Sequence, residues 1–390
     1  MIPVSEARAH LLDLVVKLEA EEVPLAEAAG RVLARDMQAR RDQPPFSASA
    51  MDGYAVNAAE VELHAMFKVI GEAAAGHAFV GRVGAGQAVR IFTGAPVPEG
   101  ASFVVIQEDV TRSGDLITIT DEPGSNHNIR PRGGDFTDGQ TVSAPRLLAP
   151  ADIALLAAMN IPTVPVIRRP DVALISTGDE LVMPGGTPGP DQIIASNTFG
   201  LKAMLEGFGA RAHILPIARD TEGSLRTAFE LAEGADLVVT IGGASVGDHD
   251  LVGKVAQDLG LERSFYKVAM RPGKPLMAGR MGAAAMVGLP GNPVSAMVCG
   301  HVFLAPMIRA MLGLPAETAQ LRTAELAAAL PENGPREHYM RAQAESGRLT
   351  AFDNQDSSLL TVLAEANALL VRPPRDRARA AGENVQYLPI

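Results

Sequence analysis

Residues 236–250 constrain the fold of this chain more than any other stretch. They read Asp-Leu-Val-Val-Thr-Ile-Gly-Gly-Ala-Ser-Val-Gly-Asp-His-Asp. The first six include five apolar or β-branched residues, which is typical of a short buried strand, and the glycines, serine and aspartates that follow end it abruptly. Open parallel sheets bind ligands at such strand ends. The stretch therefore predicts a buried strand leading into a ligand-binding loop.

The loop after this strand excludes two common nucleotide motifs. Gly242 and Gly247 have the spacing of a P-loop, but Asp248 and His249 follow where that motif needs Lys and Ser or Thr. The sequence also contains no G-x-G-x-x-G. What remains is a tight loop whose N–H groups could face phosphate, with carboxylates that would repel phosphate unless a cation such as Mg²⁺ intervened. An ordinary turn, with Asp248 or Asp250 capping the next helix, fits the stretch equally well.

The flanking sequence alternates between strand and helix patterns. Strands are expected at residues 172–175, 212–217, 265–268 and 284–288, and helices at 198–206, 222–232, 251–259 and from Pro293. This alternation predicts a doubly wound parallel α/β domain over residues 170–313.

The remaining sequence predicts three smaller parts. Residues 46–143 are rich in Gly and β-branched residues and predict a β-rich domain, with strands at 67–70, 88–92, 103–107 and 116–120. Residues 1–45 and 144–169 predict a helical and linker domain, with a helix capped by Ser5 and another at 151–159. Residues 314–390 predict a second β-rich domain that contains a helix at 357–366.

Composition limits the function. At 390 residues, two to four domains are expected. The 45 acidic and 34 basic residues give a net charge of −11, which argues against nucleic-acid binding. Cys299 is the single cysteine and is expected to be a small core residue. With no signal-peptide pattern and no apolar run approaching ~18 residues, we expect a cytoplasmic protein without a membrane role.

Several polar motifs suggest an anionic ligand. Three cations, Lys267, Arg271 and Lys274, lie within eight residues of an acidic chain, although a solvated surface loop would explain them too. Asn292 and Pro293 have the pattern of a helix start, which favours anions but is also a plain cap. The segments around Asp52, Thr93 and Asp135 could likewise be functional or ordinary turns.

Six motifs, taken together, resemble the MoeA family of molybdopterin molybdenumtransferases, which is related to the E domain of gephyrin. They occur in the family's order and span essentially the whole chain: Ser49-Ala-Met-Asp-Gly-Tyr-Ala55, Ile91-Phe-Thr-Gly-Ala-Pro-Val-Pro98, Ser176-Thr-Gly-Asp-Glu-Leu181, Gly242-Gly-Ala-Ser-Val-Gly-Asp-His-Asp250, Lys267-Val-Ala-Met-Arg-Pro-Gly-Lys-Pro275 and Gly288-Leu-Pro-Gly-Asn-Pro-Val-Ser295.

The resemblance implies an elongated homodimer of four-part subunits with a MogA-like α/β domain. It also implies that molybdate and adenylylated molybdopterin react there with Mg²⁺ and release AMP, in a site shared between subunits. Transient contact with the molybdopterin adenylyltransferase is a further implication. The family's catalytic positions fall on Asp52, Thr93, Asp135, Glu180, Asp220, Asp250 and Lys267. Its metal-binding positions fall on Glu180, Asp220 and Asp250. Its substrate-binding positions fall on Gly242, Gly243, Ser245, Gly247, Asp248, Arg271, Lys274, Pro290, Pro293, Ser295, Arg341 and Ser357.

One departure and two rival functions accompany the resemblance. The family commonly has Lys where this chain has Arg271; because a guanidinium still holds a tetrahedral oxyanion, we expect retuned affinity. A molybdopterin adenylyltransferase of the MogA type would have the α/β domain alone. A non-enzymatic scaffold resembling gephyrin would have lost charged residues such as Asp52, Glu180 and Lys274. Molybdate and tungstate are not distinguished by the sequence.

Overall fold

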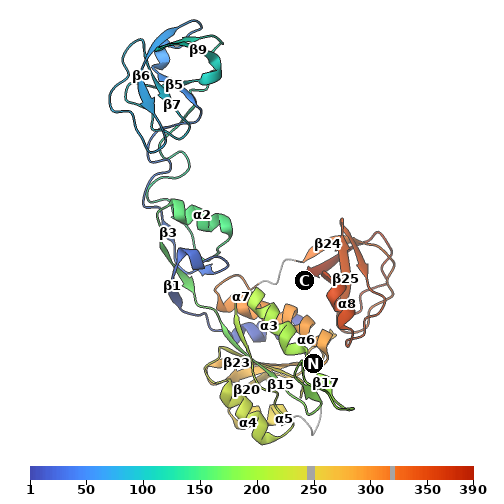
Figure 1. Cartoon of the computed structure of the whole chain (residues 1–390). Coiled ribbons are helices and arrows are strands. Elements are labelled where there is room, and N and C mark those ends of the chain that lie inside the picture. Colours follow the sequence, from blue (N-terminus) through green and yellow to red (C-terminus); the bar gives the residue numbers. More distant parts are fainter. Residues whose placement is uncertain (244–250, 317–320) are drawn as a thin grey trace. The chain divides into compact units, whose positions relative to one another are not determined.

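The computed structural model describes residues 1–243, 251–316 and 321–390 (Figure 1). The chain forms two compact units. One unit comprises residues 1–21 and 167–390, and it contains the α/β domain and the C-terminal β-rich domain. The other comprises residues 22–166.

The α/β domain is built on a six-stranded sheet of order β18-β15-β19-β23-β22-β20. Its strands are β18 (Arg211–Ile214), β15 (Asp171–Ser176), β19 (Leu237–Ile241), β23 (Ala284–Leu289), β22 (Met277–Met281) and β20 (Leu261–Phe265). The first four are parallel, as the strand–helix alternation predicted, and β22 and β20 are antiparallel additions. The strand expected at 265–268 is wrong in position. Antiparallel pairing with β22 places β20 four residues earlier, where Leu261 and Phe265 are buried.

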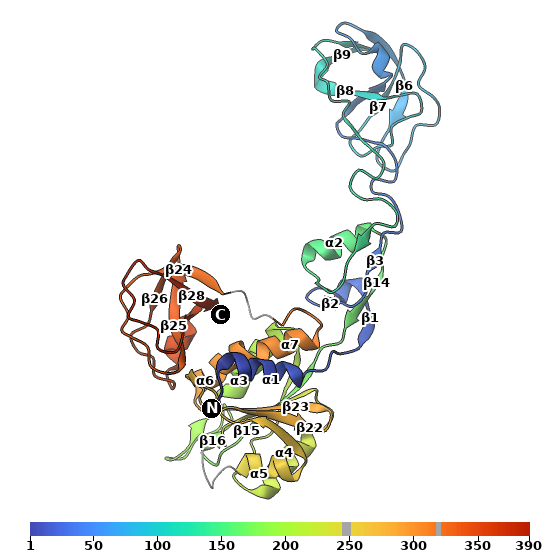
Figure 2. The ribbon, with the colours of Figure 1, turned by 180° about the vertical axis from the view of Figure 1, so that it is seen from behind.

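Helices cover both faces of this sheet. Figures 1 and 2 show α4 (Glu222–Leu231) and α5 (Leu251–Asp258) on one face, and α3 (Asn197–Gly207), α6 (Pro293–Cys299) and α7 (Ala305–Met311) on the other. Because strand side chains alternate, Ala173 and Ile175 of β15 join the core under α4 and α5, packed with Leu225 and Phe229. The doubly wound architecture is therefore confirmed.

A π-helical turn, η4 (Gly300–Leu304), joins α6 and α7 into one helical segment, Pro293–Met311. By length and composition this segment could cross a membrane, which the sequence did not lead us to expect. Its 18-residue apolar window is 78% buried inside the α/β domain, as in a core helix of a soluble protein. Cys299 is fully buried on it, and burial raises the pKa of its thiol, so the expected core role is confirmed.

The N-terminal helix α1 (Val4–Asp13) corrects the predicted cap. Pro3 occupies the N-cap position without a side-chain hydrogen bond, and Ser5 lies inside the first turn. Val4, Ala7 and Leu11 form the buried side of the helix, at helical spacing. Proline at the entrance suits the extended backbone that precedes a helix.

The C-terminal domain is a six-stranded sheet of order β21-β25-β26-β24-β28-β27. Its members are β21 (Met270–Arg271), β25 (Glu337–Glu345), β26 (Arg348–Ala351), β24 (Arg322–Leu326), β28 (Asn384–Pro389) and β27 (Ala368–Arg372). The predicted helix is shorter than expected, α8 (Leu360–Glu365). Strand β21 comes from the α/β segment and pairs in parallel with β25. The two domains of this unit therefore share a backbone ladder.

The second unit carries the other β-rich domain, with sheet order β8-β5-β7-β6-β10-β9. Its strands are β5 (Gly53–Val56), β6 (Met66–Ala73), β7 (Gln87–Ile91), β8 (Phe103–Ile106), β9 (Val110–Ser113) and β10 (Leu116–Ile119). The unit also has helix α2 (Pro150–Ala158) and a sheet of order β1-β14-β2-β13. That sheet contains β1 (Ala20–Pro24), β14 (Thr163–Ile167), β2 (Val32–Leu33) and β13 (Arg146–Leu147). Two short ladders complete it: β3 (Met37–Gln38) with β12 (Thr141–Val142), and β4 (Ala48–Ser49) with β11 (Ile129–Arg130).

Candidate functional site

Three loops meet at the carboxyl edge of the α/β sheet, after β15, β19 and β23. The Thr177 N–H donates to the Ile241 carbonyl at 3.0 Å, and the Gly242 N–H donates to the Leu289 carbonyl at 3.1 Å. Gly243 has φ +64, and a Cβ there would lie 2.4 Å from a methyl of Val252. A side chain therefore cannot be added to this loop without moving α5.

These loops line a cavity of about 560 Å³, here called the strand-end cavity. Its walls include the sequence-predicted residues Glu180, Gly242, Pro290 and Pro293. Ser358 reaches it from the C-terminal domain. Strands β16 (Leu181–Val182) and β17 (Ile193–Ile194), a short parallel pair, provide its outer edge. The strand-end loops thus enclose a site of the kind expected for an open α/β sheet.

The predicted metal ligands are only partly described. Ser245, Gly247, Asp248 and Asp250 lie outside the described residues. Glu180 and Asp220 are exposed on neighbouring loops, which are joined by the Gly178 N–H donating to the Ala218 carbonyl at 3.1 Å. Glu180 lines the strand-end cavity, whereas Asp220 does not. Among the described residues no three acidic, His or Cys side chains group closely enough to hold a metal. The Glu180 carboxylate is nonetheless the type of oxygen ligand that Mg²⁺ prefers. Because Mg²⁺ usually keeps several water ligands, it needs only one or two protein carboxylates.

A second cavity of about 350 Å³, here called the cation cavity, adjoins the first. The two share Pro275, Pro290 and Asn292 in their walls. Arg271 and Lys274 line it together with three serine or arginine side chains, Ser295, Ser357 and Arg336. Neither the Arg271 nor the Lys274 side chain makes a hydrogen bond or ion pair with any residue that the structure describes. Their charges therefore remain available to an anion.

The basic loop is held against the core by one glycine. Gly273 has φ +107, and a Cβ there would lie 2.5 Å from the Sγ atom of Cys299. The Lys274 carbonyl accepts a hydrogen bond from the Val268 N–H at 3.2 Å. The loop is thus folded on itself and packed on α6, with Arg271 and Lys274 exposed.

Arg341 lies beneath the segment that forms one wall of the cation cavity. Its side chain is fully buried, and its Nη2 donates to the carbonyls of Asp356 at 2.9 Å and Asn354 at 3.4 Å. Its Nε and Nη1 have no hydrogen-bond partner within residues 1–243, 251–316 and 321–390. Desolvation lowers the pKa of Arg341, with Arg271 adding to the effect and Asp356 opposing it. Arg341 lines neither of the two cavities, so it supports the cavity wall from below.

The start of α6 joins the two domains at this place. Asn292 is the N-cap residue and Pro293 the first helical residue, as the sequence predicted. The Asn292 side chain does not cap the helix; it donates to the Ser357 hydroxyl at 3.0 Å, and the Val294 N–H donates to the Ser357 carbonyl at 3.1 Å. Ser357 is therefore fixed to the helix start.

The second unit contains a separate polar pair, Asp52 and Thr93. One Asp52 carboxylate oxygen accepts hydrogen bonds from the Thr93 N–H at 2.7 Å and the Thr93 hydroxyl at 2.8 Å. These bonds, the backbone one first, lower the pKa of Asp52, with a smaller contribution from Arg90. The Asp52 carboxylate is thus a fixed anion at neutral pH.

Two predicted catalytic residues lie apart from these groups. Asp135 is exposed on a loop whose backbone bonds to Gln43, and it makes no hydrogen bond or ion pair with Asp52 or Thr93. The Lys267 Nζ lies 5.4 Å from the centre of the Tyr266 ring, and the residue lines neither cavity.

Sequence reasoning missed His338 and Arg336, which line cavities at the C-terminal domain. A lone histidine or arginine carries no local sequence signal of a binding site. Only the pairing of β21 with β25 brings Arg336 and His338 beside Arg271.

Comparison with known proteins decides the family. The model of the MoeA N-terminal region (domain I and II) matches residues 2–160, that of a probable molybdopterin binding domain matches 173–310, and that of the MoeA C-terminal region (domain IV) matches 323–390. A molybdopterin molybdenumtransferase of Haemophilus influenzae is 34% identical over 400 residues, covering 100% of this chain and 99% of the relative. The chain belongs to the MoeA family.

Other relatives agree with this assignment. Molybdopterin molybdenumtransferase 2 of Mycobacterium tuberculosis is 36% identical over 380 residues, and the alignment covers 93% of this chain and 93% of the relative. A crystal structure of a molybdopterin biosynthesis MoeA protein from Pyrococcus horikoshii matches with a TM-score of 0.86 at 28% identity, over 100% of both chains. The resemblance found in the six motifs is thereby confirmed.

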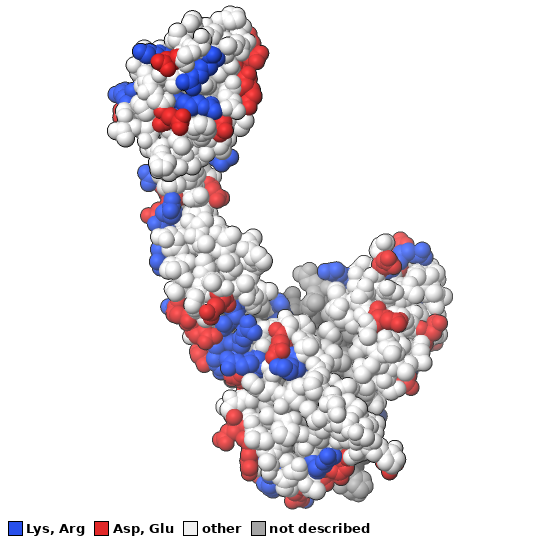
Figure 3. Space-filling view, in the orientation of Figure 1, with Lys and Arg blue, Asp and Glu red and all other residues white. Residues whose placement is uncertain are grey.

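Charged side chains are mixed over the molecular face in Figure 3. Over the β-rich domain of the second unit, Lys and Arg side chains lie beside Asp and Glu side chains, and no continuous basic surface appears in this view. In the first unit, by contrast, Arg271, Lys274 and Arg336 line one and the same cavity, the cation cavity.

Proposed function

We propose that this chain transfers molybdenum from molybdate to adenylylated molybdopterin and releases AMP, with Mg²⁺, in the cytoplasm. Membership of the MoeA family makes the chain a transferase of molybdenum cofactor biosynthesis. The finer reaction is our inference from the site.

One observation carries the proposal: the strand-end cavity and the cation cavity are adjacent and share walls. The strand-end cavity suits a phosphorylated pterin nucleotide, because it lies at the carboxyl ends of parallel strands, where open α/β sheets bind ligands. The cation cavity, with the unpaired Arg271 and Lys274, suits a tetrahedral dianion. A nucleotide and an oxyanion bound side by side are what the transfer of metal between them requires.

Glu180, with Asp220 and Asp250, would hold Mg²⁺ at the edge of the strand-end cavity. The bound ion would neutralise the phosphoanhydride and polarise it for hydrolysis. The residues of this chain would meanwhile position both substrates. Pro293, at the start of α6, lines the strand-end cavity, and Lys274 and Ser357 line the cation cavity.

We also propose a homodimer in which Asp52 and Thr93 of one subunit complete the site of the other. The Asp52–Thr93 pair is preorganised by two short hydrogen bonds, which an ordinary exposed turn does not need. A two-fold dimer then has two composite sites. Delivery of the nucleotide by a molybdopterin adenylyltransferase would be transient.

The direct test supplies adenylylated molybdopterin, Mg²⁺ and molybdate, and measures AMP and molybdenum-loaded cofactor. We expect both products, and loss of both on omission of molybdate or addition of a chelator. Turnover that is insensitive to chelator would contradict the Mg²⁺ role. Adenylylation of molybdopterin by ATP, with release of pyrophosphate and without molybdenum transfer, would favour an adenylyltransferase.

A further inference from the structure

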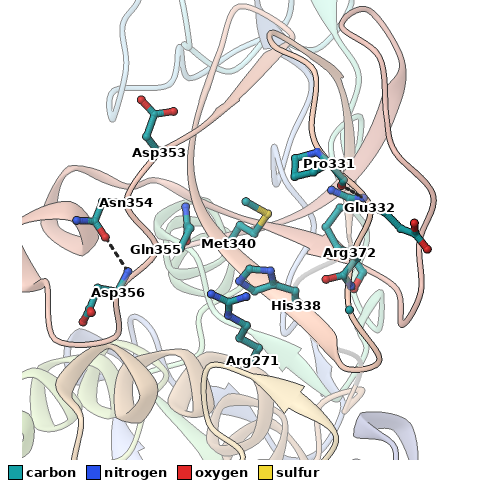
Figure 4. Close-up of a pocket in the computed structure, with 12 residues that line it drawn as sticks. Arg271, Pro331, Glu332, His338, Met340, Asp353, Asn354, Gln355, Asp356 and Arg372 are labelled. Atoms are coloured by element: carbon teal, nitrogen blue, oxygen red, sulfur yellow. Dashed lines mark hydrogen bonds between the residues drawn. The ribbon is translucent and has the colours of Figure 1, made fainter.

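A third cavity, of about 470 Å³ and here called the His338 cavity, lies at one end of the C-terminal sheet. Arg271, His338 and Arg372 line it, with Gln355 and Asp356 on the side that it shares with the cation cavity. Figure 4 shows Arg271 and His338 side by side in its middle. No role follows for this cavity from molybdenum transfer.

Strand register places three of its basic groups in one row. Arg271 of β21 is the direct partner of His338 in β25, and His338 is the direct partner of Arg372 in β27. Because directly paired residues point to the same face of a sheet, the three side chains lie on one face of adjacent strands. The sheet itself therefore builds a row of potential hydrogen-bond donors.

The row has unused hydrogen-bonding groups. His338 is 6% exposed, and its buried Nε2 has no hydrogen-bond partner in the described part of the chain. Arg372 donates through Nε to Asp376 and through Nη2 to the carbonyls of Pro331 and Arg377, and its Nη1 has no partner among the described residues. The Arg271 side chain makes no hydrogen bond or ion pair within that part of the chain. Buried polar groups without partners are destabilising, so a ligand that bonds to them is favoured.

The positive charge around the row favours a ligand with a negative charge. Burial, together with the charges of Arg271, Arg341, Arg372 and Arg336, lowers the pKa of His338 to about 3. The charges of four guanidinium groups thus act on one neutral imidazole.

The acidic groups nearby leave this positive charge largely uncompensated at the row. Asp376 pairs with Arg372, and one carboxylate oxygen of Asp356 accepts bonds from the Ser358 N–H and hydroxyl. The other two carboxylates in the wall, Glu332 and Asp353, lie apart from the Arg271–His338 pair in Figure 4.

We propose that the Arg271–His338–Arg372 row is a second oxyanion-binding subsite, distinct from the cation cavity. Its ligand is a tetrahedral oxyanion, which comes either as a free inorganic ion or as the phosphoryl group of a nucleotide. Arg271 lines both the His338 cavity and the cation cavity, so anions bound in the two cavities would contact the same guanidinium group. The subsite thereby tunes the affinity of the cation cavity.

Binding at this subsite is coupled to proton uptake. A bound dianion offsets the four arginine charges, which raises the pKa of His338 in the complex and lets the imidazolium donate to the ligand. Affinity is then highest below the His338 pKa of about 3 in the free protein, falls as the pH rises, and levels off above the higher His338 pKa of the complex.

The test measures oxyanion stoichiometry with molybdate alone, by equilibrium dialysis and titration calorimetry in buffers of different ionisation enthalpy. We expect two molybdate ions per wild-type chain, with proton uptake at one site. His338→Phe should bind one ion without proton uptake, and Lys274→Ala should weaken the other site. His338→Gln, which keeps an amide donor, should retain weak binding at the subsite and lose the proton uptake.

Competition identifies the source of the oxyanion. Displacement of the proton-coupled molybdate by sulfate assigns the site to a free ion, and displacement by AMP at lower concentration assigns it to a phosphoryl group. A single molybdate per wild-type chain, or two per folded His338→Phe and His338→Gln chain, would overturn the subsite. Two ions without any AMP release would instead leave the subsite standing and reject the proposed transfer reaction.

Discussion

The side-chain amide of Asn292 donates a hydrogen bond to the Ser357 hydroxyl at 3.0 Å. This bond connects the N-cap residue of α6 in the α/β domain to the C-terminal domain at the wall of the cation cavity. Asn292 also lines the strand-end cavity. A single residue thus contacts both cavities and fixes the segment that covers Arg341.

Asn292→Ala is expected to weaken molybdate binding while leaving the fold intact. Loss of a neutral hydrogen bond costs about 0.5–1.5 kcal/mol. A double-mutant cycle with Ser357→Ala should give a coupling energy of about 0.5–1 kcal/mol in molybdate affinity. Additive effects of the two substitutions would show that the bond does not organise the cavity.

Lys274→Ala should raise the molybdate requirement for AMP release about tenfold, with a smaller change in pterin-nucleotide binding. The loss of one charge-assisted contact is worth about 1.5 kcal/mol at an exposed side chain. Lys254→Ala is the matched control, because this exposed lysine pairs with Glu222 on the opposite side of the sheet from α6. If both variants show the same molybdate dependence, the basic loop is an ordinary surface loop and does not bind molybdate.

Gly273→Ala should destabilise the first unit and displace the basic loop. The new Cβ would be strained at φ +107 and would lie 2.5 Å from the Sγ atom of Cys299, for an expected loss of about 2–4 kcal/mol in unfolding free energy. Gly282→Ala is the control, because Gly282 also has positive φ but nothing lies within 4 Å of the position that its new Cβ would take. It should cost about 1 kcal/mol. Cys299→Ala should recover part of the Gly273→Ala loss in thermal melts, and no recovery would place the strain elsewhere.

The C-terminal domain should lose stability in acid through Asp376. Hydrogen bonds from Arg379, the largest cause, and from Arg372 lower the pKa of this carboxyl, which is 7% exposed. Its stabilising effect is therefore complete above the ordinary Asp pKa of 3.8 and is lost as the pH falls through the lower pKa of the folded state.

Asp376→Asn should remove that acid-dependent part and cost about 3–5 kcal/mol at pH 7, because Arg372 would be left buried without its counter-charge. Urea unfolding between pH 2 and 7 measures both effects. Asp115→Asn, at an exposed turn, is the control substitution for the loss of a carboxylate.

Mixed dimers test the shared site. Asp52→Ala and Asp250→Ala should each be nearly inactive alone, whereas a heterodimer of the two would contain one intact site and recover about half the activity. A mixture of two differently tagged Asp52→Ala preparations is the control and should stay inactive. Confirmed subunit exchange without recovered activity would place both aspartates in the site of one chain.

Local sequence was sufficient for the elements whose signals are local. The alternation around residues 236–250 predicted β15, β19, β23 and the helices between them, because buried parallel strands are continuous apolar runs. Asn292 and Pro293 predicted the start of α6 for a similar reason: cap and first-turn preferences act within a few residues. The six ordered motifs also indicated the MoeA family.

Features that depend on distant partners were missed. Strand β22 follows no apolar alternation that distinguishes it from a loop, and it forms because it can pair with both β23 and β20. The pairing of β21 with β25 brings Arg271 beside His338. The neighbouring hydrogen bond from Arg336 to the Met270 carbonyl joins residues that are 66 positions apart in the sequence. Likewise, Asn292 bonds Ser357 rather than its own helix. Residue types and local periodicity determined the helices and strands. Backbone pairing and burial across the fold determined which charged groups face each other. The free energy of these long-range contacts arises only when distant segments come together and exclude water, so the sequence alone did not predict them.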